Sequence, residues 1–223
     1  MFRKMSRPSS AHSTAGTSLF TPLQRRRNRR RQLCGERFGK RVAPLTIEPL
    51  EDRAMLATVA VTTTNDVVDT VETDINNLAG NPGTDGFVSL CEAIIAANTT
   101  SGADTINLAA GAHTISLAGT AENAAATGDF DITESLTLVG VGQGTNPVTD
   151  TIIDGGGSDR VFQVFSGVTA VFQDMTIQNG TTFDNGTTTA TALGGGILST
   201  SANITLDNVL LQNNSANGTF PGV

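Results

Sequence analysis

The side chains best placed to do chemistry in this sequence are three aspartates, Asp150, Asp154 and Asp159. An inverting glycoside hydrolase uses two carboxyl groups about 6.5–9.5 Å apart that flank the scissile bond. Adjacent coils of a repeat structure could bring these carboxylates to one face. However, Asp154 begins the run Asp-Gly-Gly-Gly-Ser-Asp, and Asp-Gly pairs commonly cap backbone amides in turns. The pattern favours structural turns over catalysis, so no catalytic residue is assigned.

Calcium binding and lyase chemistry are two further possibilities for this region. Gly155–Asp159 partly matches the Gly-Gly-x-Gly-x-Asp nonapeptide of calcium-binding β-rolls, which makes Asp159 a weak candidate for a calcium ligand. That nonapeptide works by repetition, and here it occurs once. A polyuronate lyase needs basic residues, and Arg160 is the only one after Arg53. We therefore expect neither a bound metal nor a cofactor.

The sequence offers few residues that could act as catalytic nucleophiles or stack against sugar rings. The chain has two His and two Cys and lacks Trp and Tyr, which excludes a multi-histidine metal centre and removes the usual aromatic platform for sugars. His113 fits a strand-edge position better than a general base. Cys91 fits a small buried thiol, and a Cys34–Cys91 bridge has little geometric support because Cys34 precedes the folded segment.

Charge divides the 223 residues into two segments. Thirteen of the fourteen basic residues and four of the 21 acidic ones precede Ala54, so residues 1–53 carry nine net positive charges and residues 54–223 carry sixteen net negative ones. The leader is centred on the run Arg25–Arg31 and has no apolar periodicity, which predicts disorder. A basic leader before an export signal explains the run better than a nucleic-acid arm, because the acidic domain would repel nucleic acid. No apolar run approaches the roughly 18 residues of a transmembrane helix.

Residues 54–223 have the pattern of many short β-strands, in which β-branched runs alternate with Gly, Asn and Asp. The expected strands are 105–108, 114–117, 135–139, 151–153, 161–165, 168–172, 175–177 and 204–211. Period-two alternation predicts an interior lined by Ile106, Leu108, Ile115, Leu117, Leu136, Leu138, Ile152, Phe172, Met175, Ile177, Ile204, Leu206, Val209 and Leu211. On this prediction, Leu206→Asp costs several kcal/mol because it buries an unpaired charge.

Two segments repeat at an offset of 34 residues, Phe172–Asn179 and Leu206–Asn213, with matching apolar positions and a shared final Gln-Asn. Such a unit predicts a β-solenoid, in which coils stack through their backbones and turn asparagines form side-chain ladders. No segment suited to cover the last coil follows Ser215. We therefore expect a β-helix domain that is incomplete at its C-terminus, or one that self-associates end to end.

One helix is expected at residues 89–98. Ser89 and Glu92 form a Ser-x-x-Glu capping box, and apolar residues follow at helical spacing. A short amphipathic helix before the first coil suits a lid over the exposed end of the solenoid.

The segment Val88–Asn98 resembles the CSLREA motif, usually Cys-Ser-Leu-Arg-Glu-Ala-Ile-x-Ala-Ala-Asn. Residues 103–108, 151–155 and 194–197 look like the continuation of that family, so the resemblance runs from about residue 85 to 217. It implies a right-handed parallel β-helix like those of polymorphic outer-membrane and adhesin-type proteins. Val88 replaces the motif's cysteine and Cys91 its arginine, so the roles of those two motif residues are not transferred.

A second resemblance lies at residues 47–56, Ile-Glu-Pro-Leu-Glu-Asp-Arg-Ala-Met-Leu. It is similar to the LEP-L-E-D-R-x-L-L motif near the N-termini of large exported proteins of planctomycete-type bacteria. The resemblance implies a bacterial protein that is secreted or held at the cell surface, in the outer membrane or outside it.

These observations lead to two functional hypotheses. The first is a non-enzymatic, exported, structural or adhesin-like β-helix protein whose ligand is an unidentified surface or extracellular protein or glycan. The alternative is a carbohydrate-active enzyme, a polysaccharide hydrolase or lyase, that acts through Asp150, Asp154 or Asp159 on the same fold. Fold alone does not decide between them.

Overall fold

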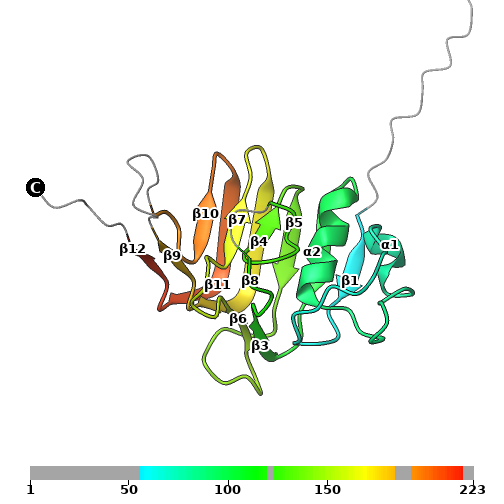
Figure 1. Cartoon of the computed structure of the whole chain (residues 1–223), viewed down its shortest axis with the longest axis horizontal. Coiled ribbons are helices and arrows are strands. Elements are labelled where there is room, and N and C mark those ends of the chain that lie inside the picture. The colour runs from blue at the N-terminus through cyan, green and yellow to red at the C-terminus, as the bar shows by residue number, and fades with distance from the viewer. Residues whose placement is uncertain (1–55, 120–122, 184–191, 218–223) are drawn as a thin grey trace, which may run out of the picture. The chain divides into compact units, whose positions relative to one another are not determined.

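The computed structural model describes residues 56–119, 123–183 and 192–217 (Figure 1). This part of the chain is mostly β, its strands pair in parallel, and it contains two helices, α1 (Ile75–Leu78) and α2 (Leu90–Thr99). The predictions for the basic leader at 1–53 and for nearly all of the motif at 47–56 fall outside the described residues.

The largest sheet curls and has seven strands: β1 (Thr58–Ala60), β2 (Asp104–Asn107), β3 (Gly111–Thr114), β5 (Leu136–Val139), β6 (Thr151–Asp154), β8 (Thr169–Gln178) and β11 (Asn203–Gln212). Their order is β1-β2-β5-β8-β6-β3, and β11 adds to β8. A second sheet holds β4 (Phe130–Ile132), β7 (Phe162–Val164) and β10 (Ile197–Ser199), and a third pairs β9 (Thr181–Phe183) with β12 (Ser215–Asn217). The strands follow one another from β1, beside the helices, to β10, β11 and β12 at the opposite end (Figure 1).

Strands β8 and β11 pair residue by residue at the 34-residue offset of the sequence repeat, with Phe172 opposite Leu206 and Ile177 opposite Leu211. Both strands turn a corner at a residue with positive φ, 53° at Asp174 and 52° at Asn208. Asp and Asn tolerate this left-handed conformation better than other non-glycine residues. Because of the corner, the first half of β8 pairs with β5 and the second half with β6. The two strands expected at 168–172 and 175–177 are therefore one strand.

Hydrogen bonds of side-chain amides form ladders between neighbouring strands, both at these corners and at the ends of β6, β8 and β11. Asn208 Nδ2 donates to Asp174 Oδ1 at 2.7 Å. Gln212 Nε2 donates to Gln178 Oε1 at 2.7 Å, and Gln178 Nε2 donates to Asp154 Oδ2 at 2.7 Å. Each rung pairs a donor with an acceptor on the adjacent strand, so the ladders reinforce the backbone register.

The core lies between the two larger sheets and under α2. Three phenylalanines meet in it: the ring centroids of Phe130 and Phe162 are 5.5 Å apart, and those of Phe162 and Phe172 are 4.9 Å apart. Eight of the predicted interior residues are buried in this core, namely Ile106, Leu108, Ile115, Leu136, Leu138, Phe172, Met175 and Ile177.

The remaining interior predictions need correction. Ile152 is buried outside the core, opposite Thr176, whereas Ile153 faces the core opposite Ile177. Leu117 is only half-buried. Apolar residues occupy both faces of β6, so alternation alone did not determine which face points inward.

Strand β11 accounts for the other corrections. Ile204 and Val209 are half-buried against the core, while Leu206 and Leu211 are 43% and 47% exposed. The expected cost of Leu206→Asp falls accordingly to about 1–2 kcal/mol, because much of this side chain is already in water.

The strand expected at 114–117 ends earlier, because β3 stops at Thr114. Beyond it, the carboxylate of Asp66 accepts hydrogen bonds from the backbone N–H groups of Ser116 and Leu117, at 2.7 and 2.8 Å. A side chain thus satisfies the donors that a longer strand would have paired.

Helix α2 begins one residue after the expected start, with Ser89 as its N-cap. Ser89 Oγ accepts from the Glu92 N–H at 3.1 Å, and Glu92 Oε2 accepts from the Ser89 N–H at 3.0 Å. The other carboxylate oxygen of Glu92 accepts from the backbone of Asp69 at 2.9 Å and Thr70 at 3.2 Å. The capping box therefore also fastens the preceding loop to the helix. Neither described helix has the length and apolar character that crossing a membrane requires.

Candidate functional site

The three aspartates singled out in the sequence lie in three different environments. Asp150 closes its own loop, because its carboxylate accepts from the Asn146 backbone N–H at 2.9 Å and from Thr149 Oγ1 at 3.0 Å. This loop precedes β6 and contains no other acidic residue. The contacts of Asp150 are those of a turn-capping carboxylate.

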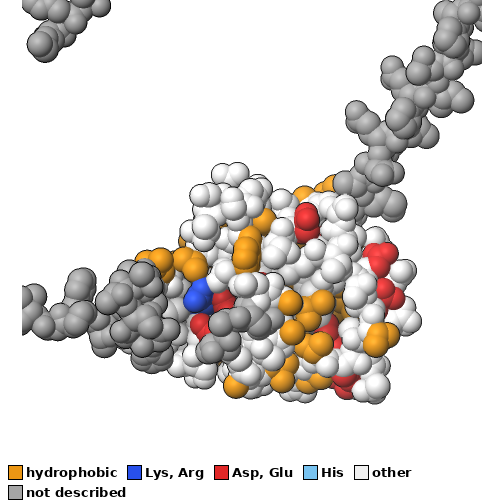
Figure 2. All heavy atoms as spheres, turned by 45° about the horizontal axis from the view of Figure 1, so that its top comes forward, with side chains coloured by type: hydrophobic (Ala, Val, Ile, Leu, Met, Phe, Trp, Pro, Cys, Tyr) orange, Lys and Arg blue, Asp and Glu red, His pale blue; other side chains and the backbone are white. Residues whose placement is uncertain are grey.

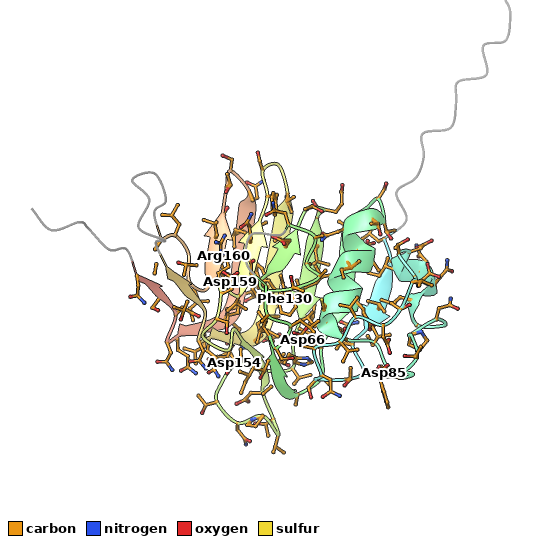
Figure 3. The ribbon with its side chains drawn as sticks, in the orientation of Figure 1. Asp66, Asp85, Phe130, Asp154, Asp159 and Arg160 are labelled. Atoms are coloured by element: carbon orange, nitrogen blue, oxygen red, sulfur yellow. The ribbon has the colours of Figure 1, made fainter. Side chains whose placement is uncertain are left out.

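Asp154 ends β6 at a corner of the sheet, away from Asp159 and Arg160 (Figure 3). Its carboxylate accepts from the Gly156 N–H at 2.9 Å, from Asn179 Nδ2 at 2.8 Å and from the Gln178 amide. An open surface groove here is lined by Asp154, Gly156, Gly157, Asn179, Thr181 and Asn213. Asp154 thus begins an amide ladder, and its two oxygens are already engaged.

Asp159 is 8% exposed and belongs to a cluster in which the buried Asp129 interacts with the buried Asp131 and Asp159 and with the half-buried Arg160. Arg160 Nε lies 3.4 Å from Asp129 Oδ2 and 3.8 Å from Asp159 Oδ1. Asp131 Oδ2 accepts from the Ala125 N–H at 3.2 Å. Arg160 is the only basic residue after residue 53, and Figure 2 shows acidic atoms beside the one basic patch of the described part. We name these four residues the Asp129 cluster.

Local backbone structure positions the Asp129 cluster. In strand β4, Phe130 and Ile132 belong to the core and Asp131 lies between them in sequence, while Asp129 directly precedes the strand; all four residues are buried. Gly128, which has a φ of 73°, directly precedes Asp129 and lies against the backbone of Gly119. A Cβ atom at Gly128 would lie only 2.4 Å from the Gly119 carbonyl oxygen. Only glycine allows the backbone to approach so closely in this conformation.

Electrostatics in the Asp129 cluster are unbalanced, because three buried carboxyl groups face one guanidinium. Burial raises the pKa of the Asp129 carboxyl to about 7; Arg160 opposes this shift, while Asp131 and Asp159 add to it. A carboxyl group that titrates near neutral pH can exchange protons there, although structural ion-pair networks also perturb pKa values. The cluster is the one place in the described part where carboxylates from two segments of the chain, residues 129–131 and the turn before β7, gather around the guanidinium of Arg160.

Sequence reasoning missed Asp129 and Asp131. The one signal was the alternation of Asp129-Phe130-Asp131-Ile132, whose last three residues form strand β4, and it is too short to establish a period. The sequence analysis did not predict this three-residue strand, so its carboxylates were not connected with Asp159.

Metal binding finds little support at Asp159. Its carboxylate faces Arg160, and it also accepts from the Arg160 backbone N–H at 2.8 Å. Within the residues the structure describes, no group of three or more His, Cys, Asp or Glu side chains is arranged to hold a metal ion.

His113 and Cys91 are both buried. His113 lies on β3, an outer strand in the sheet order, and its Nε2 has no hydrogen-bond partner beside a cavity of about 10 Å³, room for about one water. Burial lowers the pKa of the His113 imidazole, so the neutral form is favoured. The Cys91 thiol donates to the Ala125 carbonyl at 2.6 Å, as a small buried thiol on a helix would.

No family model, curated protein or solved structure matches this chain. Function is therefore inferred from its own residues and contacts. Asp150 and Asp154 act in turns and ladders, and Asp159 pairs with Arg160. Among the described residues, no hydrogen bond or ion pair joins any two of these three aspartates.

Proposed function

We propose that residues 54–223 form a right-handed parallel β-helix and that the protein is a non-enzymatic structural or adhesin-like module, exported to the bacterial surface or beyond. The observation that carries this proposal is the in-register stacking of β8 and β11 at 34 residues. A unit of this kind buries one face against its neighbours and presents its outward residues and loops as a surface for binding. Parallel strands joined by crossovers are almost always right-handed, which supports the assigned hand.

Two resemblances support the location and the type of module. The segment at 88–98 resembles the CSLREA motif of adhesin-type β-helix proteins, and residues 47–56 resemble an export-associated motif of planctomycete-type bacteria. The acidic composition of residues 54–223 also suits a surface module that does not bind nucleic acid. We propose an unidentified extracellular protein or glycan as the ligand.

The enzyme alternative has one observation in its favour, the Asp129 cluster. A carboxyl with a pKa of about 7 beside two further carboxyl groups is the kind of environment in which glycosidases hold a general acid. On this alternative, Asp129 gives a proton to the leaving oxygen of a polysaccharide, and Asp129→Asn abolishes the release of reducing ends.

Attachment of the producing cells tests the proposed function directly. Cells that lack the gene should attach several-fold less to glycan- or protein-coated surfaces, and the gene for the full chain should restore attachment. Asp129→Asn is the matched variant, because it removes a proton donor while keeping the shape of the side chain. Restored attachment with Asp129→Asn supports a structural role; loss of attachment together with loss of polysaccharide cleavage supports the enzyme.

Export is tested by fractionating those cells and measuring the mature N-terminus by mass spectrometry. We expect the protein in the surface or extracellular fraction, with a mature chain that begins between Ala54 and Thr58. A chain with intact Met1 in the cytosol would overturn the proposed location.

A further inference from the structure

The outer edge of β11 is an unoccupied interaction surface. In the described ranges, β11 pairs with β8 on one side and with no strand on the other. Leu206 and Leu211 are 43% and 47% exposed, whereas the residues opposite them on β8, Phe172 and Ile177, are fully buried. Free N–H and C=O groups beside a row of exposed apolar side chains form a template for another β-strand.

The sequence of β11 is complementary to itself when it is read backwards. Two copies of β11 can pair antiparallel about a centre between residues 207 and 208. Amide side chains then lie opposite amide side chains, apolar side chains lie opposite apolar ones, and a carboxylate lies opposite an amide. The opposed pairs are Asn203 with Gln212, Ile204 with Leu211, Thr205 with Leu210, Leu206 with Val209, and Asp207 with Asn208. Only the Thr205–Leu210 pair mixes classes.

The geometry of the strand matches this symmetry. Ile204 and Leu206 lie inward before the corner and Val209 and Leu211 after it, because each is opposite a fully buried residue of β8. The positive φ of Asn208 shifts the alternation by one residue and makes this possible. A two-fold axis through the corner places the half of β11 before the corner in one copy against the half after the corner in the second copy. Each of the four inward apolar residues then lies opposite an inward apolar residue of the second copy.

The need to keep both inward faces on the same side also determines whether the two β11 strands run parallel or antiparallel. Two identical free edges can meet antiparallel with both inner faces on the same side. They can meet in parallel only if one inner face turns outward, which exposes its leucines. Antiparallel pairing also places Asp207, the only charged residue of β11, opposite the amide of Asn208 rather than opposite another Asp207. Within the chain, Asn208 already bonds to the carboxylate of Asp174 in the same way.

We propose that the chain forms a two-fold symmetric dimer through antiparallel pairing of β11 with β11 of a second copy. The interface is isologous, so it closes at two copies and does not propagate. It continues the large sheet across both molecules and covers the apolar residues that β11 leaves in water. This inference concerns assembly and does not depend on whether the protein is an adhesin or an enzyme.

Sedimentation of the full chain measures the association. We expect a concentration-dependent rise from the mass of one copy, 23.0 kDa, to twice that mass and no further. Leu206→Asp should weaken dimerisation at least tenfold, because it places a charge opposite Val209 of the second copy. The matched control is Thr205→Asp, which adds the same charge one residue away on the outer face and should leave dimerisation nearly unchanged. Circular dichroism at low concentration checks that each variant is folded.

Disulfide trapping tests the register and remains informative if Leu206→Asp fails to fold. Opposed residues of antiparallel strands have Cα atoms about 4.5–5.5 Å apart, within disulfide range. A mixture of the Thr205→Cys and Leu210→Cys variants should form a cross-linked dimer under mild oxidation. Each variant alone should stay at the background of the unsubstituted chain, which contains Cys34 and Cys91.

Three outcomes would overturn the proposal. Cross-linking of Thr205→Cys with itself would indicate a different register or a parallel arrangement. Growth of the mass beyond two copies would indicate head-to-tail stacking. A monomer at all concentrations, with no cross-link in the mixture, would mean that β11 is covered in another way.

Discussion

Strands β8 and β11 carry nearly the same pattern and differ mainly in what covers them. Their residues pair at a constant offset of 34, both turn at a left-handed corner, and both point apolar side chains to one side. Yet Phe172, Met175 and Ile177 are fully buried, while Leu206 and Leu211 are about half exposed. The pattern within a strand therefore sets which side chains face inward, and the neighbouring strands decide how far those side chains are removed from water.

The largest expected difference between the two strands is in the cost of truncating an aromatic or aliphatic side chain. Phe172→Ala should lower the free energy of unfolding by about 3–5 kcal/mol, because it opens a cavity next to the ring of Phe162. Leu206→Ala should lower it by about 1 kcal/mol. Urea unfolding at a concentration where the chain is monomeric measures both. Equal losses would contradict the difference in burial.

The comparison extends to charge, because Asp129, the residue before β4, is buried whereas Asp207 on β11 is exposed. The pKa of Asp129 is about 7 in the fold, against an ordinary value of 3.8. At pH values between 3.8 and about 7, the folded chain holds the proton of the Asp129 carboxyl more readily than the unfolded chain does. The contribution of Asp129 to stability is therefore greatest below about pH 4 and is lost as the pH rises from there through 7.

Asp129→Asn should remove this dependence and make the protein more stable than the parent at pH 8, measured by urea unfolding across the pH range. Asp207→Asn is the matched control, because it makes the same substitution at an exposed position of β11. A parent profile that does not differ from that of Asp129→Asn would show that the carboxyl of Asp129 titrates normally.

A smaller difference in stability is expected between truncating Gln178 and truncating Gln212, the two glutamines of the amide ladder. The Gln178 side chain bonds to the side chains of Asp154 and Gln212, whereas in the described part the Gln212 side chain bonds to that of Gln178 alone. Since a hydrogen bond contributes about 0.5–1.5 kcal/mol, Gln178→Ala should cost roughly twice as much as Gln212→Ala. Thermal unfolding of the two variants at equal concentration makes the comparison. The reverse order would mean that the ladder does not stabilise the fold.

Local signals were sufficient to predict several elements from the sequence. The Ser89–Glu92 capping box located α2, and the 34-residue repeat located the paired strands β8 and β11. Capping and side-chain alternation depend on neighbours within a few residues, so they can be recognised from the sequence alone.

Long-range partners determine what the sequence did not reveal. The choice between Ile152 and Ile153 as the core residue depends on which one lies opposite Ile177. The end of β3 depends on Asp66, about fifty positions away. The Asp129 cluster forms only because β4 and the segment before β7 become neighbours, and three residues of strand are too few to show a periodicity.

The position of Arg160 also bears on how well the folded segment resists proteolysis. Proteases of the trypsin type cleave after Lys or Arg, and in residues 54–223 the bond from Arg160 to Val161 is the only one that they recognise. Val161 is fully buried, its N–H donates to the Gly195 carbonyl at 3.1 Å, and its own carbonyl accepts from the Phe130 N–H at 2.9 Å. A protease would have to unravel the strands on both sides before reaching that bond, so the folded segment should withstand proteases of the trypsin type.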